Sequence, residues 1–552
     1  MPEKRILIVG GVAGGASCAA RLRRLSESAE IVVFERGPYV SFANCGLPYY
    51  VGDVIREEAR LLVASPQLLK ARFNIDVRVA NEVTVIDRDR CEVEVKRLAG
   101  GTAYRERYDA LVLAPGAAPV RPPLPGIDLP GIFALRTVPD SRQIRQRIEE
   151  RQARAAVVVG TGFIGLELGE NLACRGLQVT MLEMLPQVMP PLDPEMAEFV
   201  NVRLIEKHVN VRLNDAVAGF EPGRDGRLIA RTRSGCRLEA DLVILAMGVK
   251  PETALASQAG LALGSQGGIK VDENMRTSDP RIWAVGDAVE VTDVVTGEVR
   301  AVPLAGLANR QGRIAADSIC GRASRFRGAQ ATAVCGAFGL TIAMTGASEK
   351  ALRRCGIADY GKVYLHPDDH ASYYPGATSI HMKLLFSAKD GRVLGAQAIG
   401  ENGVEKRIDV IAMAMQMGAT VFDLEEAELC YAPQFGSAKD PINMAGMIAA
   451  NILRGDLHPA PWEKLSDSDA LIVDVREPRE FASDHVDEAI NLPLGQLRDR
   501  MHELPRDRKI FVCCGVGQRS YYALRILLQY GFQAGSLLGG MRTYSHLPAD
   551  FE

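Results

Sequence analysis

The sequence predicts an α/β protein built from two Rossmann-like dinucleotide-binding domains, an α+β domain and a smaller C-terminal α/β module. Two glycine-rich loops each lie between a short β-rich run and a helical stretch, the pattern of a nucleotide-binding βαβ unit. A junction with glycine and prolines at 455–461 precedes a further α/β pattern. At 552 residues, the chain exceeds one ordinary core, and about three or four domains are expected.

Composition and charge exclude several classes of protein. Hydrophobic residues make up 47% and charged residues 24% of the chain, so sizeable cores can form. A net charge of −3 offers no footprint for nucleic acid, and no apolar run reaches the roughly 20 residues that cross a bilayer. The 11 cysteines show no paired zinc spacing, so we expect a cytoplasmic protein without a metal site.

The first glycine-rich loop follows the β-rich run 6–9 and precedes a helical stretch over 16–25 and a second strand over 31–34. The loop consists of Gly10, Gly11, Val12, Ala13, Gly14 and Gly15. Because Val12 replaces the middle glycine of GxGxxG, the loop by itself is a weak signal. Glu35 ends the next strand at the spacing of a ribose-binding acid, and we expect Glu35 and Arg36 to contact the same nucleotide.

The second loop lies between the strand 155–159 and the helix 164–174 and matches the fingerprint fully. Its binding residues are Gly160, Gly162, Phe163, Ile164 and Gly165, and Gly248 is expected in the same site. The glycines allow the backbone to approach a pyrophosphate at a helix N-terminus. Glu183, after the strand 179–182, can accept hydrogen bonds from the ribose hydroxyls and would repel a 2′-phosphate. This favours NADH, with NADPH as the alternative. A glycine-rich turn without a ligand is the alternative.

Two further segments resemble motifs of flavoproteins that bind two dinucleotides. Residues 284–288, with Gly286 and Asp287, are similar to the segment that holds the ribityl and phosphate region of FAD. Residues 114–116, with Ala114 and Gly116, resemble the short junction motif of the same class. The resemblance implies FAD at the first loop and NADH at the second, with a simple turn-forming aspartate as the alternative for Asp287.

A single cysteine, Cys45, lies ten residues after Glu35 in the segment SFANCGLPYY, residues 41–50. A lone cysteine is usually a small buried hydrophobe, but this position just after a nucleotide-binding strand favours presentation to a flavin. Without a CxxxxC pair, Cys45 must cycle as a thiolate, a sulfenate or a mixed disulfide. The segment resembles the coenzyme A disulfide reductases and the related NADH oxidases and peroxidases.

The resemblance covers about residues 1–451 and implies a homodimer that uses coenzyme A as a bound cofactor or a substrate. Tyr373, with Tyr374 as the alternative, and Tyr431 would reach across the dimer to the partner subunit's Cys45. Gln434 and Phe435 depart from the family's YAPPY motif. The expected coenzyme A contacts are Ser17, Arg21, Arg24, Ser41, Asn44 and Lys439. Solvated surface arginines and half-buried interface aromatics are the alternatives.

The C-terminal module carries a second candidate cysteine. A buried β-rich run over 510–513 leads into Cys514 and the sequence CGVGQRS, which resembles the rhodanese loop CxxGxRS. Backbone N–H groups, a helix N-terminus and Arg519 would surround Cys514 and stabilise a thiolate or persulfide. Cys513 is expected to be the last buried residue of the strand. A binding-only rhodanese fold is the alternative.

Taken together, the resemblances imply an enzyme similar to the NADH-dependent persulfide and polysulfide reductases. Cys45 would reduce small thiol persulfides, polysulfides or coenzyme A disulfide, and Cys514 would handle sulfane sulfur, with coenzyme A as a carrier between them. The alternatives are an NADH oxidase or peroxidase that cycles Cys45 through a sulfenate, and a non-enzymatic redox sensor or sulfur carrier. The predicted domains are FAD-binding over 1–150 and 276–325, NAD-binding over 151–275, dimerisation and substrate binding over 326–455, a linker over 456–463 and rhodanese over 464–552.

Overall fold

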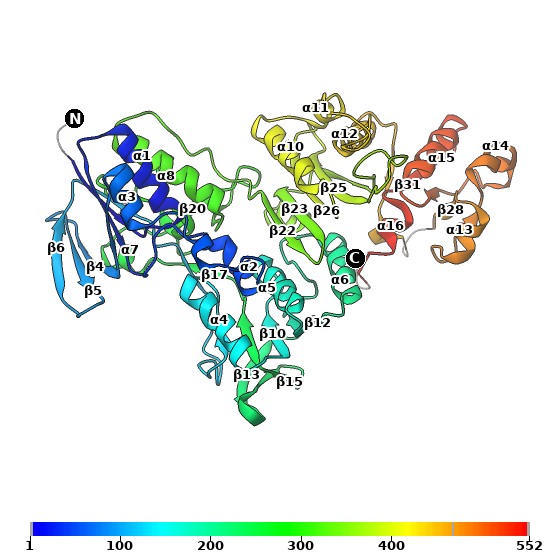
Figure 1. The fold of residues 1–552 in the computed structure, drawn as a ribbon. Coiled ribbons are helices and arrows are strands. Elements are labelled where there is room, and N and C mark those ends of the chain that lie inside the picture. Colours follow the sequence, from blue (N-terminus) through cyan, green and yellow to red (C-terminus); the bar gives the residue numbers. More distant parts are fainter. Residues whose placement is uncertain (1–3, 466–468, 549–552) are drawn as a thin grey trace. The chain divides into compact units, whose positions relative to one another are not determined.

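The computed structural model describes residues 4–465 and 469–548. These residues form two compact units (Figure 1). The first unit comprises residues 4–186 and 209–331, and the second comprises 187–208 together with the rest of the described chain from 332 onward. The helix α6 (Pro194–Glu206) therefore belongs to the second unit, although the sequence places it inside the predicted NAD-binding domain.

The first unit contains a parallel sheet with the strand order β19-β7-β1-β2-β3. Its strands are β1 (Arg5–Val9), β2 (Glu30–Glu35), β3 (Asp76–Val79), β7 (Ala110–Leu113) and β19 (Ile282–Ala284). The central strands are buried, as expected where helices cover both faces of a parallel sheet. The helices α1 (Ala13–Leu25) and α8 (Ala305–Ile319) lie side by side (Figure 1). They approach so closely that a Cβ on Gly312 would lie 2.3 Å from the carbonyl oxygen of Gly14.

A second parallel sheet in the same unit has the order β12-β11-β10-β16-β9. Its strands are β9 (Ile132–Phe133), β10 (Ala155–Val159), β11 (Gln178–Leu182), β12 (Asn210–Arg212) and β16 (Leu242–Leu245). The helix α5 (Phe163–Cys174) follows β10 and completes the βαβ unit. Two nucleotide-type sheets in one chain confirm the predicted fold class.

The second unit contains an antiparallel sheet with the order β22-β23-β26-β25-β24. Its strands are β22 (Ala333–Ala337), β23 (Leu340–Gly346), β24 (Tyr360–Leu365), β25 (Ile380–Ser387) and β26 (Val393–Gly400). The helix α9 (Glu349–Arg354) lies between β23 and β24 in sequence, and α10 (Val404–Gln416) and α12 (Pro441–Leu453) follow β26. One face of the edge strand β24 is polar and carries Tyr360, Lys362 and Tyr364.

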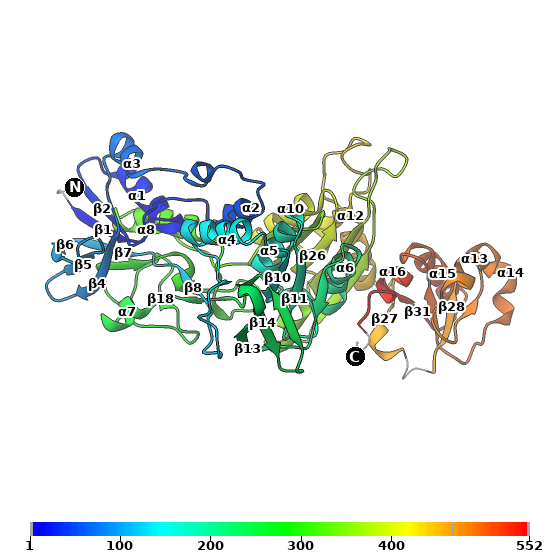
Figure 2. The same ribbon diagram turned by 60° about the horizontal axis from the view of Figure 1, so that its bottom comes forward.

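The C-terminal module of this unit is a parallel sheet with the order β27-β31-β30-β28-β29. Its strands are β27 (Pro459–Ala460), β28 (Leu471–Asp474), β29 (Ile490–Asn491), β30 (Ile510–Cys513) and β31 (Ala534–Leu537). The helices α13 (Pro478–Ser483), α15 (Gln518–Gln529) and α16 (Gly540–Tyr544) surround it (Figure 2).

The stretch 456–463, predicted as a linker, contributes a strand to this sheet, because Pro459 of β27 pairs with Ser536 of β31. The Trp462 indole N–H also donates to the carbonyl oxygen of Leu538 at 2.9 Å. The ordered C-terminal module thus begins before the boundary expected from composition. Among the described residues, no helix has both the length and the hydropathy to span a membrane.

Candidate active site

The two glycine-rich loops have the same backbone geometry. Gly10 has a φ of +94° and Gly160 has a φ of +102°, values that favour glycine. A Cβ on Gly10 would lie 2.1 Å from the carbonyl oxygen of Ala114, and one on Gly160 would lie 2.3 Å from that of Ala246. Each loop therefore passes the end of the neighbouring strand at a distance that only glycine permits.

Each loop leads directly into a helix N-terminus. The helix α1 begins after Val12, with Ala13, Gly14 and Gly15 in its first turn, and α5 begins after Gly162, with Phe163, Ile164 and Gly165 in its first turn. Neither helix has a side-chain cap, so first-turn N–H groups can serve a phosphate. A Cβ on Gly162 would meet nothing within 4 Å, so open space lies where a pyrophosphate would approach the backbone.

Glu35 and Glu183 occupy equivalent places at the ends of β2 and β11. Glu35 Oε2 accepts the backbone N–H of Gly11 at 2.9 Å, and Glu183 Oε2 accepts that of Thr161 at 3.0 Å. Each carboxylate also accepts the backbone N–H two residues further along the chain. The acids thus clamp both loops at the edge where a nucleotide ribose would lie.

The junction motif lies next to a charged cluster. Gly116 has a φ of +76°, and the Arg136 guanidinium donates to the carbonyl oxygen of Pro115 at 3.0 Å. Glu252 pairs with Arg136 and, at 2.7 Å, with Arg36. Arg36 therefore has an internal partner that the sequence did not reveal.

The predicted FAD segment reaches the first loop. A Cβ on Gly14 would lie 2.9 Å from Val285 Cγ2, and the Gly286 N–H donates to Gln311 Oε1 at 2.7 Å. Asp287 lies in the short 3-10 helix Gly286–Ala288, where burial raises the pKa of its carboxyl. Gly248, just before β17 (Val249–Pro251), has a φ of +89°, and a Cβ on it would meet nothing within 4 Å.

Cys45 lies in a 3-10 turn, Asn44–Gly46, that leads into α2 (Leu47–Val51). The residue is exposed. Partial burial of the thiol, followed by the negative charges of Glu167 and Asp287, nevertheless raises the pKa of Cys45. These protein groups favour the thiol over the thiolate. Glu167 accepts a hydrogen bond from the Tyr49 hydroxyl at 3.2 Å. The sequence did not predict that Glu167 acts on Cys45, because the two residues are far apart in the chain.

The two predicted tyrosines of the second unit come together. The hydroxyl oxygens of Tyr373 and Tyr431 are 2.8 Å apart, and their side chains are 73% and 49% exposed. Tyr374 instead packs edge-on against His370. The hydrogen bond to Tyr431 raises the pKa of Tyr373. Tyr373 is therefore the member of the Tyr373/Tyr374 pair that meets Tyr431.

The predicted coenzyme A contacts differ in their surroundings. Arg21 pairs with Asp317 of α8 at 2.7 Å, and the Ser17 hydroxyl donates to the carbonyl oxygen of Asn309 at 3.2 Å. Arg24 is exposed. The remaining predicted contacts are Asn44 and Lys439, which are also exposed, and Ser41, whose N–H donates to Gly11 in the first loop at 2.8 Å.

Cys514 lies at the start of a loop that leads into α15. Its side chain is 1% exposed, and its Sγ accepts the Gly517 N–H at 3.2 Å and lies 3.7 Å from Ser520 Oγ. Arg519 forms a bidentate pair with Glu480 of α13, with both contacts at 2.7 Å. This pairing lowers the pKa of Glu480 to about 2. The preceding cysteine ends β30 and is fully buried, as predicted.

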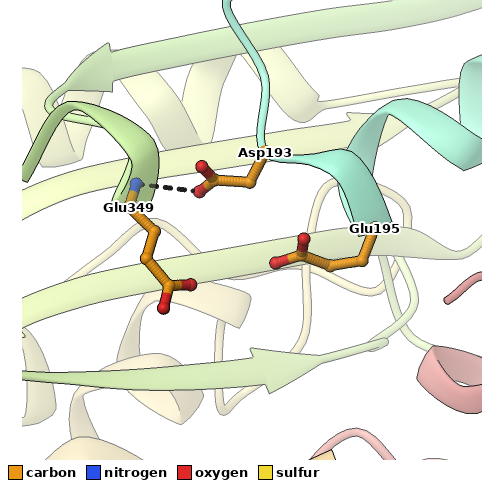
Figure 3. A group of neighbouring side chains, drawn as sticks. All are labelled: Asp193, Glu195 and Glu349. Atoms are coloured by element: carbon orange, nitrogen blue, oxygen red, sulfur yellow. Dashed lines mark hydrogen bonds between the residues drawn. The ribbon is translucent and has the colours of Figure 1, made fainter. Parts of the chain in front are cut away.

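A cluster of acids in the second unit has the spacing of a metal site. The carboxylates of Asp193, Glu195 and Glu349 lie within 4.8 Å of one another (Figure 3). Lys383 Nζ contacts these three carboxylates at 2.9, 2.5 and 2.6 Å, respectively. The buried ammonium group occupies the position that a cation would take, so the cluster is a salt-bridge network.

Comparison with family models divides the chain into three matched regions. Residues 4–312 match the pyridine nucleotide-disulphide oxidoreductase family, residues 332–440 match the dimerisation domain of that family, and residues 461–546 match the rhodanese-like domain.

Relatives and solved structures agree with these matches. A coenzyme A disulfide reductase of Staphylococcus haemolyticus is 35% identical over 81% of this chain and 100% of its own, and an NADH oxidase of Methanocaldococcus jannaschii is 37% identical over 80% and 97%. The reduced Bacillus anthracis CoADR-RHD structure has a TM-score of 0.97 at 45% identity, covering 99% of this chain and 98% of its own. An NAD-dependent persulfide reductase from A. fulgidus has a TM-score of 0.91 at 39% identity, covering 98% and 100%.

These similarities confirm the predicted resemblance to coenzyme A disulfide reductases with a fused rhodanese domain. The chain belongs to the pyridine nucleotide-disulphide oxidoreductase family, an oxidoreductase family that uses FAD and NAD(H), and carries a C-terminal rhodanese-like domain.

Proposed function

We propose that this protein uses NADH to reduce a coenzyme A persulfide, a polysulfide or coenzyme A disulfide through Cys45. The supporting observation is the combination of two thiols in one chain. Cys45 lies in an exposed turn after the first nucleotide loop, and Cys514 lies in a rhodanese-type loop. A persulfide reductase matches this chain over almost its whole length.

FAD is assigned to the loop 10–15, with Glu35, Gly116 and Asp287 around it, and NADH to the loop 160–165 with Glu183. When bound, FAD supplies the relay that accepts a hydride from NADH and passes an electron pair to sulfur. The uncapped helix N-termini and the open space at Gly162 fit a dinucleotide. The Glu183 carboxylate favours NADH because it repels a 2′-phosphate, although NADPH is also possible.

Cys45 acts as the thiolate that attacks the substrate S–S bond. Attack on the inner sulfur of a persulfide forms a mixed disulfide and releases HS⁻, and attack on the outer sulfur forms a Cys45 persulfide and releases the thiol. Either path, completed by two electrons, has the same balance: RSSH + NADH + H⁺ gives RSH + H₂S + NAD⁺. Because protein groups raise the pKa of Cys45, the thiolate requires a stabilising contact from the bound flavin.

The tyrosine pair serves the leaving sulfur in a homodimer. A tyrosine phenol is protonated at neutral pH, so the pair can donate a hydrogen bond to a departing thiolate at the partner subunit's Cys45. The match to a dimerisation domain supports this arrangement.

Cys514 accepts sulfane sulfur, and the thiol of a bound coenzyme A carries it to Cys45. The contacts expected for this cofactor are Ser17, Arg21, Arg24, Ser41, Asn44 and Lys439. Since Arg21 is already paired with Asp317, the exposed Arg24 and Lys439 are expected to make the main phosphate contacts. The scattered free cysteines favour a reducing cytoplasm as the site of action.

The test is anaerobic NADH oxidation with coenzyme A persulfide, coenzyme A disulfide and hydrogen peroxide compared side by side. Cys45→Ser should abolish reduction of the sulfur substrates, whereas Cys174→Ser, a matched change at another exposed cysteine, should leave it intact. Preference for peroxide, or persulfide reduction that survives without Cys45, would instead assign the protein to the NADH oxidases and peroxidases.

A further inference from the structure

The polar face of the edge strand β24 contacts the rhodanese module. Tyr364 lies in β24 and His366 directly follows the strand, two positions further on, so their side chains share one face. A Cβ on Gly539 would lie 2.8 Å from Tyr364 Cβ, and His366 Nε2 lies 2.9 Å from Thr543 Oγ1. The module thus packs on β24 through both ends of the helix α16, with Gly539 just before the helix and Thr543 near its end.

The salt-bridge network reaches the same module. Lys362, also on this face of β24, pairs with Glu463 at the start of the rhodanese module and with Glu349 at 3.2 Å. Glu349 is in turn held by Lys383. The rhodanese module therefore contacts the dimerisation sheet through the ion pair of Lys362 with Glu463 and through the hydrogen bond of His366 with Thr543.

The helix α16 connects His366 to the loop of Cys514. The N–H of Met541 donates to the carbonyl oxygen of Cys514 at 2.8 Å, and the N–H of Arg542 donates to that of Gly515 at 3.0 Å. A Cβ on Gly540 would lie 2.1 Å from the Cys514 carbonyl oxygen. The same short helix that touches the Cys514 loop thus carries Thr543, the partner of His366.

The orientation of His366 is itself fixed from the other side. Its Nδ1 lies 3.0 Å from His381 Nδ1, and the His381 ring stacks on Phe199 of α6, which also stacks on His546. Burial, then the nearby His381, Arg542 and His546, lowers the pKa of His366 well below its usual value. A neutral pair, in which one Nδ1 donates and the other accepts, holds the ring and aims Nε2 at Thr543.

We infer that His366 is a positioning residue for the rhodanese reaction, because through Thr543 it holds α16 against the loop that carries Cys514. The inference rests on the sulfur-transfer role proposed for Cys514. It makes a histidine of the dimerisation domain part of the support of the rhodanese site. A shift of about 1 Å in a reacting group can reduce a rate by roughly a hundredfold. Loss of the hydrogen bond between His366 and Thr543 should therefore have a measurable effect on the rate of sulfur transfer.

The test uses the full-length holoenzyme, with thiosulfate as sulfur donor and cyanide as acceptor. Cys514 takes the sulfane sulfur and releases sulfite, and cyanide removes that sulfur as thiocyanate. Thr543→Val, which removes the hydroxyl and keeps the shape, should lower kcat for thiocyanate roughly tenfold. Thr543→Ser should restore most of the rate. Ser545→Ala, which removes an exposed hydroxyl just after the same helix, should have no effect.

NADH-linked reduction of coenzyme A persulfide by Cys45 should stay unchanged in all three variants, and an unchanged near-UV circular dichroism spectrum should show that the rhodanese module folds. If Thr543→Val does not fold, His366→Phe removes the same contact from the other side, keeps an aromatic ring and should show the same loss. Wild-type kcat in Thr543→Val, or an equal loss in Thr543→Ser, would overturn the inference. Equal thiocyanate formation by wild type and Cys514→Ser would instead defeat the proposed role of Cys514, and this inference with it.

Discussion

Tyr373 and Tyr431 lie 58 residues apart in sequence, yet their hydroxyl oxygens are 2.8 Å apart. The loops that carry them are joined through the backbone, because the Ala371 N–H donates to the carbonyl oxygens of Pro433 and Gly436. Both tyrosines are largely exposed, so a partner subunit can reach the hydroxyl pair. Their joint role at the partner subunit's Cys45 stays a prediction.

Tyr431→Phe should lower the pKa of Tyr373, because the hydrogen bond that raises this pKa is lost. The same change should slow persulfide reduction by roughly a hundredfold, the lower end of the range for loss of a proton donor. A difference titration of tyrosine absorbance and steady-state kinetics test the two effects. Tyr374→Phe, outside the hydroxyl pair, is the control. Equal kinetics for both variants would contradict the role of the pair.

Cys514→Ser should abolish the relay of sulfur from thiosulfate or a protein persulfide to Cys45. Reduction of coenzyme A persulfide supplied directly should continue, because Cys45 and both nucleotide loops lie in the other unit. Sulfide release coupled to NADH oxidation measures both activities. The relay model fails if both fall equally in a folded variant.

Lys383→Met should destabilise the second unit by about 3–5 kcal/mol, because it leaves buried carboxylates without their partner. In the wild type, Lys383 lowers the pKa of Asp193 and Glu349 against the effect of burial. The stability gained from this pairing is therefore full above about pH 4 and is lost as pH falls further.

In the variant, burial without Lys383 should raise these pKa values above their unfolded values, so its stability should increase as pH falls. Thermal unfolding between about pH 5 and pH 8 should therefore show a Tm of Lys383→Met that rises as pH falls, whereas the pairing gives the wild type no such rise, because its contribution is already full in this range. Lys389→Met, at an exposed lysine, should behave as wild type. Parallel slopes for Lys383→Met and wild type would refute the assignment.

Acid should loosen the contact between β24 and the rhodanese module. Burial, then Arg542 and His546, lowers the pKa of His381 to about 3. A base whose pKa is lowered on folding contributes stability above its unfolded pKa of about 6.5, and this contribution is lost as pH falls towards the folded value. His381→Gln should therefore show a smaller fall in Tm between about pH 7 and pH 5 than the wild type. The control is His502→Gln, at an exposed histidine, which should show the same fall in Tm as the wild type. An identical fall in Tm in all three proteins would rule out the pair of His366 and His381 as the cause of that fall.

The sequence alone was sufficient to predict the two nucleotide folds and the rhodanese-like module. The apolar runs over 6–9 and 155–159 have the pattern of short buried strands and alternate with helical stretches, and Gly10 and Gly160 adopt backbone angles that favour glycine. The buried strand that ends at Cys513 was likewise evident from its run of apolar residues. Such features depend on near neighbours in the chain, so a sequence pattern records them.

Only the tertiary structure decided which distant residues meet. It assigned α6 to the second unit, paired Arg21 with Asp317 and Arg519 with Glu480, and placed His366 beside Thr543. His366 and Thr543 are 177 residues apart, and no periodicity connects them. The physical reason is that these contacts arise where chain segments cross and bury polar groups together, and burial then selects partners that satisfy one another.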